Sequence, residues 1–188
     1  MTSSMLAVTV RTPSMAPNVV APIPAVEQIR ETYMELGDRA YRQECFDIAE
    51  KMYQAALQET SELVPENACL GTILFQLGRF YFQRGLYKKA EVLCKRSLDS
   101  FERNNGRYQP SVYENFGLLG HLASVDGKFT HAEKFFKRQW VISKRVYDKH
   151  DPRISVPIRS LVQLYRKYGR MERAEALSRR FELDLLKS

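Results

Sequence analysis

Four copies of one short pattern constrain this chain more than any other feature. An Ala-Glu pair recurs at 49–50, 90–91, 132–133 and 174–175, so successive copies are 41 or 42 residues apart. A large aromatic or apolar residue stands three places before each alanine: Phe46, Tyr87, Phe129 and Met171. A fixed period of this length indicates a repeat protein, in which one small unit is copied along the chain.

Each copy also has an upstream half with helical spacing. A large residue is followed by an apolar residue three places on and a small one after that, in Tyr33-x-x-Leu36-Gly37, Leu74-x-x-Leu77-Gly78, Phe116-x-x-Leu119-Gly120 and, more weakly, Ile158-x-x-Leu161-Val162. This spacing places one apolar stripe on a helix. Gly85, Gly127 and Gly169 lie between the halves and suit a left-handed turn that ends the first helix. No stretch alternates with a period of two, so the sequence predicts an all-α array of helix-turn-helix repeats.

The same pattern predicts the domain boundaries. Residues 1–27 are rich in Pro, Ser, Thr and Ala, and we expect them to form a disordered leader. A targeting segment remains a minor alternative for this stretch. Residues 28–188 then hold the array, with repeats at about 30–63, 71–104, 113–146 and 155–188. A hairpin of two helices cannot bury its own apolar stripe, but stacked hairpins can.

Charge is divided unevenly along the chain. Residues 1–78 carry 5 Lys or Arg against 10 Asp or Glu, a net charge of −5, whereas residues 79–188 carry 24 against 12, a net charge of +12. No run of apolar residues is long enough to span a membrane. The three cysteines form no C-x-x-C motif and favour a reducing compartment, so we expect a cytoplasmic protein. We expect at least two of these cysteines to be buried as small apolar side chains.

Catalytic and ligand-binding motifs are absent from the sequence. His121, His131 and His150 lack the spacing of metal-binding histidines, and G-L-L-G at 117–120 has no Gly-Lys-Ser after it to form a phosphate loop. We therefore predict that the protein is not an enzyme and needs no cofactor or metal.

The repeats resemble the tetratricopeptide repeat. The framework of that family has a large residue at position 4, Leu at 7, a small residue at 8, an aromatic at 11, a small one at 20, an aromatic at 24 and a small one at 27. Repeat one matches it with Tyr33, Leu36, Gly37, Ala49, Tyr53 and Ala56. Repeats two and three match with two departures, Cys94 at position 24 and Ala123 at position 11, and repeat four is more degraded. The longer spacing resembles the kinesin light chain subtype, although Glu35, Gln76, Leu118 and Ser160 stand where that subtype often has Asn.

The resemblance implies a right-handed superhelical solenoid and a non-catalytic adaptor or scaffold. In such proteins positions 2, 5, 9 and 12 of each first helix line a concave groove that binds a peptide or protein. The residues that we single out at these positions are Met34, Asp38, Tyr41, Phe75, Arg79, Phe82, His121, Arg159 and Arg166. The residues that bind chaperone C-termini in other members are not matched, so such a ligand is not favoured.

These residues suggest the chemistry of a partner. Tyr41, Phe75 and Phe82 are large residues at positions that the framework does not need for packing, and exposed apolar residues off the core stripe often mark a binding surface. Arg79, Arg159 and Arg166 could bind carboxylates through paired hydrogen bonds. We expect an extended or helical peptide whose aromatic or aliphatic side chain lies near Phe75 and Phe82, with acidic residues toward Arg79 and Arg159.

Two other interactions remain open. Basic doublets such as Lys95-Arg96 and Lys137-Arg138 fall on the outer side of the second helices, where a solvated surface is the simplest interpretation. Residues 79–188 could instead bind nucleic acid or another anionic surface, which is the less favoured alternative. The last helix carries an apolar flank that could mediate self-association.

Overall fold

The computed structural model describes residues 23–63, 68–104 and 106–186, and these residues form eight α-helices. Their bounds are α1 Ile23–Arg42, α2 Phe46–Leu63, α3 Ala68–Gln83, α4 Tyr87–Asn104, α5 Pro110–Val125, α6 Phe129–Val146, α7 Ser155–Lys167 and α8 Met171–Leu186. One turn of 3₁₀-helix, Pro152–Ile154, precedes α7. No strand occurs in these ranges, which confirms the all-α prediction.

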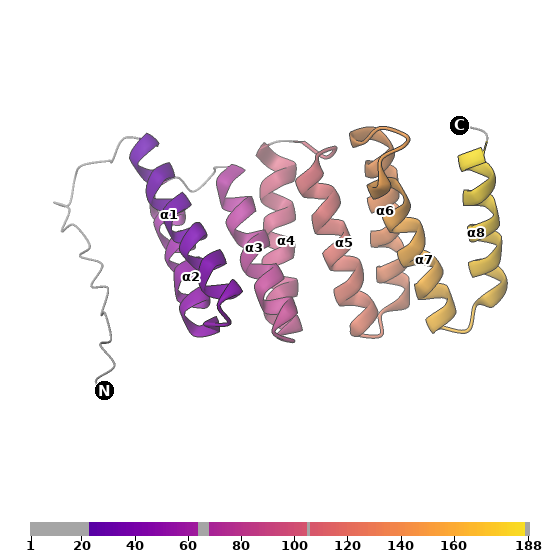
Figure 1. Ribbon diagram of the computed structural model, residues 1–188, viewed down its shortest axis with the longest axis horizontal. Helices are drawn as coiled ribbons and strands as arrows, with labels where there is room; N and C mark the ends of the chain where they lie inside the picture. Colours follow the sequence, from indigo (N-terminus) through magenta and orange to yellow (C-terminus); the bar gives the residue numbers. More distant parts are fainter. Residues whose placement is uncertain (1–22, 64–67, 105, 187–188) are drawn as a thin grey trace.

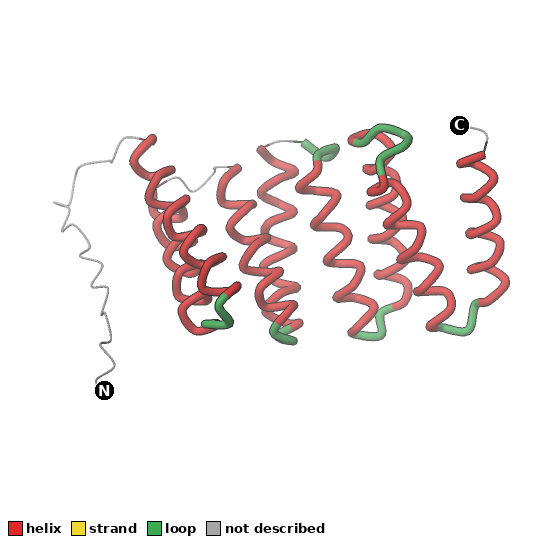
Figure 2. The backbone as a smooth tube through the Cα atoms, viewed as in Figure 1, coloured by secondary structure: helices red, strands yellow, loops and turns green. Residues whose placement is uncertain are grey.

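The eight helices pair into four hairpins that stack side by side. The pairs α1–α2, α3–α4, α5–α6 and α7–α8 follow one another along the longest axis of the molecule (Figure 1). Short turns join the helices within each pair (Figure 2). Each even-numbered helix before α8 also packs on the next odd-numbered helix, and α3 contacts α5 directly. The arrangement is a helical repeat solenoid, in which each hairpin mainly contacts its neighbours.

Three of the four hairpin turns are made by glycine. Gly85, Gly127 and Gly169 have φ angles of 74°, 75° and 69°, in the left-handed region where a side chain is strained. This confirms the role predicted for these glycines. The first hairpin differs, because Glu44 takes the same place with a φ angle of 59°.

A glycine at position 8 faces the side chain at position 24 in each of the first three hairpins. A Cβ atom added to Gly37 would lie 2.7 Å from the Tyr53 ring, and one added to Gly78 would lie 2.8 Å from Cys94 Sγ. Gly120 meets the ring of Phe136 in the same way. The two helices of a hairpin can therefore approach closely only because position 8 has no side chain.

The recurring Ala-Glu pair serves two different purposes. The alanines Ala49, Ala90, Ala132 and Ala174 are all fully buried. The following glutamate bonds to the next hairpin: Tyr81 Oη donates to Glu50 Oε1 at 2.6 Å, and Tyr165 Oη donates to Glu133 Oε1 at 2.7 Å. Between hairpins two and three this bond is missing, because position 11 is Ala123, and Glu91 instead accepts from Lys95 Nζ at 2.6 Å.

A short polar chain crosses the core between hairpins two and three. Ser97 Oγ donates to the carbonyl of Gly71 at 2.7 Å, and Asn115 Nδ2 donates to Ser97 Oγ at 2.8 Å. Ser97 and Asn115 are both fully buried. Buried polar groups need such partners, so these bonds fix how α3, α4 and α5 lie against one another.

Two expectations need correction. The predicted leader 1–27 overlaps α1, which begins at Ile23, because Pro24 falls in the first helical turn, where a missing N–H breaks no intrahelical bond. Residues 1–22 lie outside the described residues. Of the three cysteines Cys94 is buried, Cys69 is half-buried and Cys45, which precedes α2, is exposed, so the expectation of two buried cysteines holds for one.

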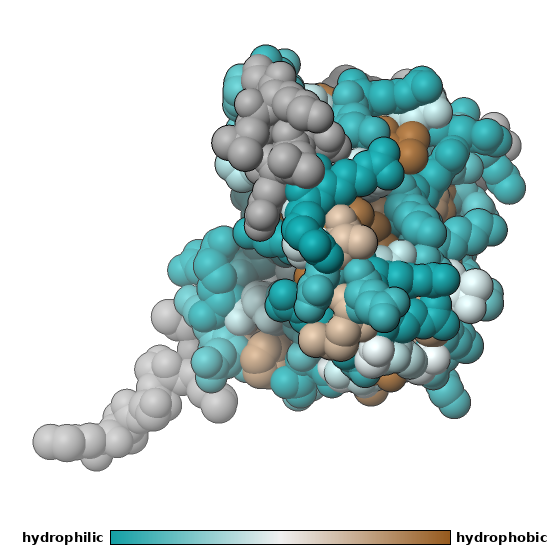
Figure 3. Space-filling view, turned by 90° about the vertical axis from the view of Figure 1, so that its right-hand side faces the viewer, coloured by the Kyte–Doolittle hydropathy of each residue, from teal (hydrophilic) through white to brown (hydrophobic). Residues whose placement is uncertain are grey.

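The expected apolar flank of α8 is partly described. Met171 is 51% exposed, whereas Leu177 and Phe181 pack against a buried cluster that includes Ile158, Leu161 and Ala174. The side chains after Phe181 lie outside the described residues. The end of the array that carries α8 is largely hydrophilic, with small separate apolar patches (Figure 3).

Candidate functional site

A cleft of about 490 Å³ opens on the side of the array formed by the odd-numbered helices. Most of its lining comes from α3 and α5, which contact each other, and the rest from α6 and from α7. We call it the inner cleft and define it by the residues Phe75, Arg79, Phe82, Gln83, Tyr113, Glu114, Gly117, Leu118, His121, Gln139 and Val156. Four of the nine predicted groove residues, Phe75, Arg79, Phe82 and His121, therefore meet in one place.

Phe75 belongs to the core rather than to an open surface. It is only 6% exposed and packs in a cluster with Phe101, Val112, Tyr113 and Phe116. We expected Phe75, at position 5 of repeat two, to be unnecessary for packing. That expectation is wrong, because Phe75 is part of the core. The ring fills the space between hairpins two and three and forms the floor of the cleft.

Arg79 is the cation of the inner cleft. It is exposed, its guanidinium lies 5.9 Å from the centre of the Phe75 ring, and its Nη1 donates to Gln76 Oε1 at 3.1 Å. Within the described ranges no carboxylate forms an ion pair with it. The guanidinium can therefore donate hydrogen bonds to a carboxylate of a ligand without breaking an internal salt bridge.

Apolar side chains flank this cation. Phe82 is half-buried, and its ring centre lies 5.7 Å from that of Tyr87. Leu118, at position 6 of repeat three, is also half-buried and lines the cleft where kinesin-light-chain-like repeats often carry Asn. An aromatic or aliphatic side chain of a ligand would be desolvated between these two residues.

His121 lies on the opposite wall. Its ring packs edge-on against Phe136 with centres 5.1 Å apart, and partial desolvation lowers the pKa of the imidazole below its ordinary value of 6.5. The imidazole is therefore protonated less readily than that of an ordinary histidine. Glu114 is exposed on the same wall, and its carboxylate repels acidic residues of a ligand on this side of the cleft.

The other predicted groove residues lie outside this cleft. In repeat one, Asp38 accepts a hydrogen bond of 2.6 Å from Tyr53 Oη, and Tyr41 packs edge-on against Phe46 and Phe80. Met34 is half-buried against the same core. Arg159 and Arg166 are exposed on α7 and do not line the cleft.

Sequence reasoning missed Gln83, Tyr113, Leu118 and Gln139. Gln139 had a detectable signal, because it stands at position 27 of repeat three, where the framework has a small residue and repeats one and two have Ala56 and Ser97. A side chain as large as glutamine at a packing position indicates that a residue on a neighbouring helix is smaller than usual and leaves room for it.

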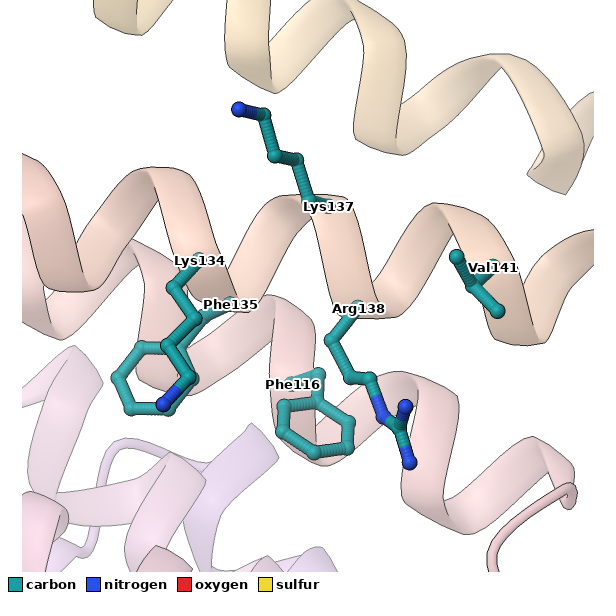
Figure 4. A pocket seen from close by; sticks show the side chains of 6 residues that line it. All are labelled: Phe116, Lys134, Phe135, Lys137, Arg138 and Val141. Carbon is teal, nitrogen blue, oxygen red and sulfur yellow. The ribbon is translucent and has the colours of Figure 1, made fainter.

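A second cleft of about 370 Å³ lies on α6 and reaches Phe116 of α5 (Figure 4). We call it the outer cleft and define it by the residues Phe116, Lys134, Phe135, Lys137, Arg138 and Val141. The Lys134 side chain runs alongside Phe135, and the Arg138 side chain extends toward Phe116 (Figure 4). Lys137 Nζ contacts Glu133 Oε1 at 2.7 Å. The charged residues that line this cleft are thus all cations around an apolar floor.

The described helices contain no segment long and apolar enough to cross a membrane. In the same residues no group of three or more His, Cys, Asp or Glu side chains could hold a metal ion.

Known proteins match both the sequence and the fold. Residues 28–103 match the family model described as tetratricopeptide repeat. BtubC (BKLC) from P. vanneervenii has 23% identity and a TM-score of 0.76 over 82% of this chain. A Podosopora anserina kinesin light chain with nearly identical TPR-like repeats has 15% identity and a TM-score of 0.67 over 80% of this chain and 72% of its own.

These likenesses show the fold. This chain spans 62% of the length of the BtubC chain, which is less than two thirds. The N-terminal domain of stress-induced protein-1 from C. elegans is also similar, with 19% identity and a TM-score of 0.55 over 79% of this chain and 98% of that one. Tetratricopeptide repeats generally mediate protein–protein interaction, and proteins built from them are typically non-catalytic. Residues 28–103 are therefore identified as tetratricopeptide repeats, and the array as a whole has the fold of kinesin-light-chain-like repeat proteins.

Proposed function

We propose that the protein is a non-catalytic adaptor that binds a peptide segment of a partner protein in the inner cleft. The single observation that carries this proposal is the juxtaposition of Arg79, which has no carboxylate partner in the described ranges, with the half-buried Phe82 and Leu118. The preferred segment has an acidic residue for Arg79 and an aromatic or aliphatic residue for the apolar wall. A few such anchors supply most of the energy of a peptide interface.

The first test is selection of binders from a display library of random 12-residue peptides. We expect selected peptides to pair an acidic residue with a nearby aromatic or aliphatic residue. Arg79→Ala should weaken their binding about tenfold or more, because a charge-assisted hydrogen bond to the ligand is lost. Phe82→Ala should weaken binding similarly, with circular dichroism confirming that each variant is folded.

The matched control for this test is Arg173→Ala. Arg173 is an exposed arginine on α8, and the change removes the same charge away from the inner cleft. Binding to this variant should equal that of the unaltered protein. Equal losses from Arg79→Ala and Arg173→Ala would show a general charge effect and rule out the inner cleft as the peptide site.

A second candidate function is the binding of an anionic partner at the outer cleft. The observation that favours it is the set of cations around Phe116 and Phe135 (Figure 4). A gel shift with a 30-residue single-stranded RNA across a salt series tests this candidate. Binding should fall steeply with salt and weaken in a Lys134→Ala/Arg138→Ala variant, whereas Arg79→Ala should have a small effect. Absence of a shift at low salt would eliminate it.

Two further parts of the proposal concern the cell and the assembly. The odd number of cysteines and the lack of a C-x-x-C motif in the sequence support the proposed cytoplasmic location. Self-association through α8 rests on the exposed Met171. Sedimentation equilibrium between about 2 and 200 µM, a range of about two orders of magnitude suited to weak association, would show a rising mass if self-association occurs. A constant monomer mass would exclude self-association in that range.

A further inference from the structure

Gln139 is a large polar side chain in a place that the repeat framework reserves for small ones. It lies on α6, seven residues after the buried Ala132, and is only 4% exposed. The equivalent residues of the first two hairpins are Ala56 and Ser97, both fully buried. The extra length of Gln139 carries its amide from the second row of helices to the inner cleft, which it helps to line.

Gly117 provides the space for this amide. A Cβ atom added at Gly117 would lie 2.5 Å from Gln139 Nε2 and 3.2 Å from Cδ, so a side chain at this position would displace the amide from where it now lies. The same position carries Met34 in repeat one and Phe75 in repeat two. Because Gly117 has no side chain, the surface of α5 has a gap at this position. The Gln139 amide fills this gap at the bottom of the inner cleft.

The amide is not satisfied within the fold. Gln139 Oε1 is fully buried and has no hydrogen-bond partner among the described residues. Three other buried side-chain atoms of the described residues are also unpaired, namely Thr60 Oγ1, Asn115 Oδ1 and Tyr147 Oη, but none of these residues lines the inner cleft. Leaving a buried carbonyl oxygen unpaired destabilises a protein, and Gln139 Oε1 is the one of these atoms whose residue lines a cleft that a ligand can enter.

A carboxamide has one donor end and one acceptor end, which rotation about the last side-chain bond can exchange. It carries no charge, so it is complementary to a neutral group that both donates and accepts. The peptide bond is such a group. An extended peptide has backbone N–H and C=O groups that need partners when they are buried, whereas a helix satisfies these groups internally.

We propose that the Gln139 amide hydrogen-bonds a backbone peptide bond of the segment bound in the inner cleft, and that the segment therefore binds in an extended conformation. This inference rests on the proposed function. Arg79 and Phe82 then contact side chains of the bound segment. Gln139 bonds the backbone of that segment and fixes its position along the cleft.

The test uses one peptide selected from the 12-residue library and a set of analogues in which a single amide is replaced by an ester. An ester has no N–H and is a weaker acceptor. One analogue should bind the unaltered protein about fivefold more weakly than the parent peptide, because a single neutral hydrogen bond contributes that much. In Gln139→Leu this same analogue should bind as well as the parent peptide.

Two further variants keep the test independent of folding. Gly117→Ala fills the space beside α5 with a methyl group and so displaces the Gln139 amide. Like Gln139→Leu, this variant should bind the ester analogue as well as the parent peptide. Gln163→Leu makes the same change at an exposed glutamine of α7, outside the inner cleft, and should keep the sensitivity. Thermal unfolding should show Gln139→Leu to be at least as stable as the unaltered protein, because an unpaired polar group has been removed.

The outcomes separate the two proposals. If a selected peptide depends on Arg79 but every ester analogue behaves alike in the unaltered protein and in Gln139→Leu, the role of Gln139 is wrong and the peptide site stands. If no library peptide binds, or if binding ignores Arg79, the proposed function fails and this inference fails with it. A peptide that becomes helical on binding, measured by circular dichroism of the complex, also overturns the extended conformation.

Discussion

At the scale of single residues, close approach between helices depends on where side chains are missing. Gly37, Gly78 and Gly120 each lie against the side chain at position 24 of the same hairpin. The side chain is a tyrosine, a cysteine or a phenylalanine, so the glycine is the constant part of the contact and the partner varies. Gly117 uses the same device for a different purpose, since it admits a polar amide to the inner cleft.

We predict that Gly120→Ala lowers the free energy of unfolding by about 1–3 kcal/mol, because the new methyl group would overlap the buried ring of Phe136. Urea unfolding followed by circular dichroism measures the change. In a Phe136→Leu background the same alanine should cost clearly less, because the ring that it meets is gone. Equal costs in both backgrounds would show that the glycine is needed for another reason.

At the scale of helices, the turns and the links between hairpins explain why some copies of the pattern differ. Glu44 occupies a left-handed turn position that is glycine in the other three hairpins. Ala123 replaces an aromatic residue and leaves Glu91 without a tyrosine across the repeat boundary. Each departure is local, because its neighbours in the stack keep the common arrangement.

Replacement of Glu44 by Gly should stabilise the protein by about 0.5 kcal/mol. Relief of the left-handed strain, about 1–2 kcal/mol, is partly offset by the greater entropy of glycine in the unfolded chain. The reverse change, Gly127→Glu, should destabilise by a similar or larger amount. Urea midpoints of the two variants check the prediction, and a stabilising Gly127→Glu would contradict it.

The bond from Tyr165 to Glu133 should stabilise the contact between hairpins three and four by about 1 kcal/mol. A double-mutant cycle with Tyr165→Phe and Glu133→Gln measures this coupling at pH 7. The equivalent pair between hairpins two and three, Ala123 and Glu91, lacks this bond and offers a control. Ala123→Tyr should stabilise the protein when Glu91 is present and should not do so in a Glu91→Gln background. Zero coupling at Tyr165 would show that the hydrogen bond is replaced by water at no loss.

The same bond should depend on pH. Burial alone would raise the pKa of the Glu133 carboxyl, but hydrogen bonds from Lys137 and Tyr165 outweigh it and lower the pKa below the ordinary 4.5. The unfolded state therefore binds the proton more readily than the folded state. The stabilisation is fully present above pH 4.5 and is lost as the pH falls through the lowered value, so the coupling should shrink there.

At the scale of the whole molecule, stability is shared between neighbours along the stack. Among the described helices α6 packs on both α5 and α7, whereas α8 packs mainly on α7 and less extensively than the partners within the other hairpins. Figure 1 shows the same separation of α8 from the rest of the array. Opening α8 therefore disrupts fewer contacts than opening α6.

Backbone amides of α8 should accordingly exchange with deuterium faster than those of α6 at the same pH and temperature. Exchange followed by mass spectrometry measures both helices in one experiment. Amides of the first turns are left out of the comparison, because they have no partner within their own helix. Equal protection of α6 and α8 would mean that the array opens as one cooperative unit.

The sequence by itself determined the repeat period, the all-α class and the glycine turns. It could do so because these features depend on residues close together along one hairpin, where the spacing of side chains on a helix is fixed. It also placed Arg79 and Phe82 on one face of the first helix of repeat two, one turn apart.

Only the tertiary structure decided which of these side chains are available to a partner. Phe75 shares the face of Arg79, but packing against α4 and α5 buries it, and the sequence of α3 alone does not contain that contact. Gln139 reaches the inner cleft only because Gly117, 22 residues earlier on another helix, leaves it room. Such pairings depend on how two helices meet in space, because burial is a property of the packed stack rather than of any one repeat.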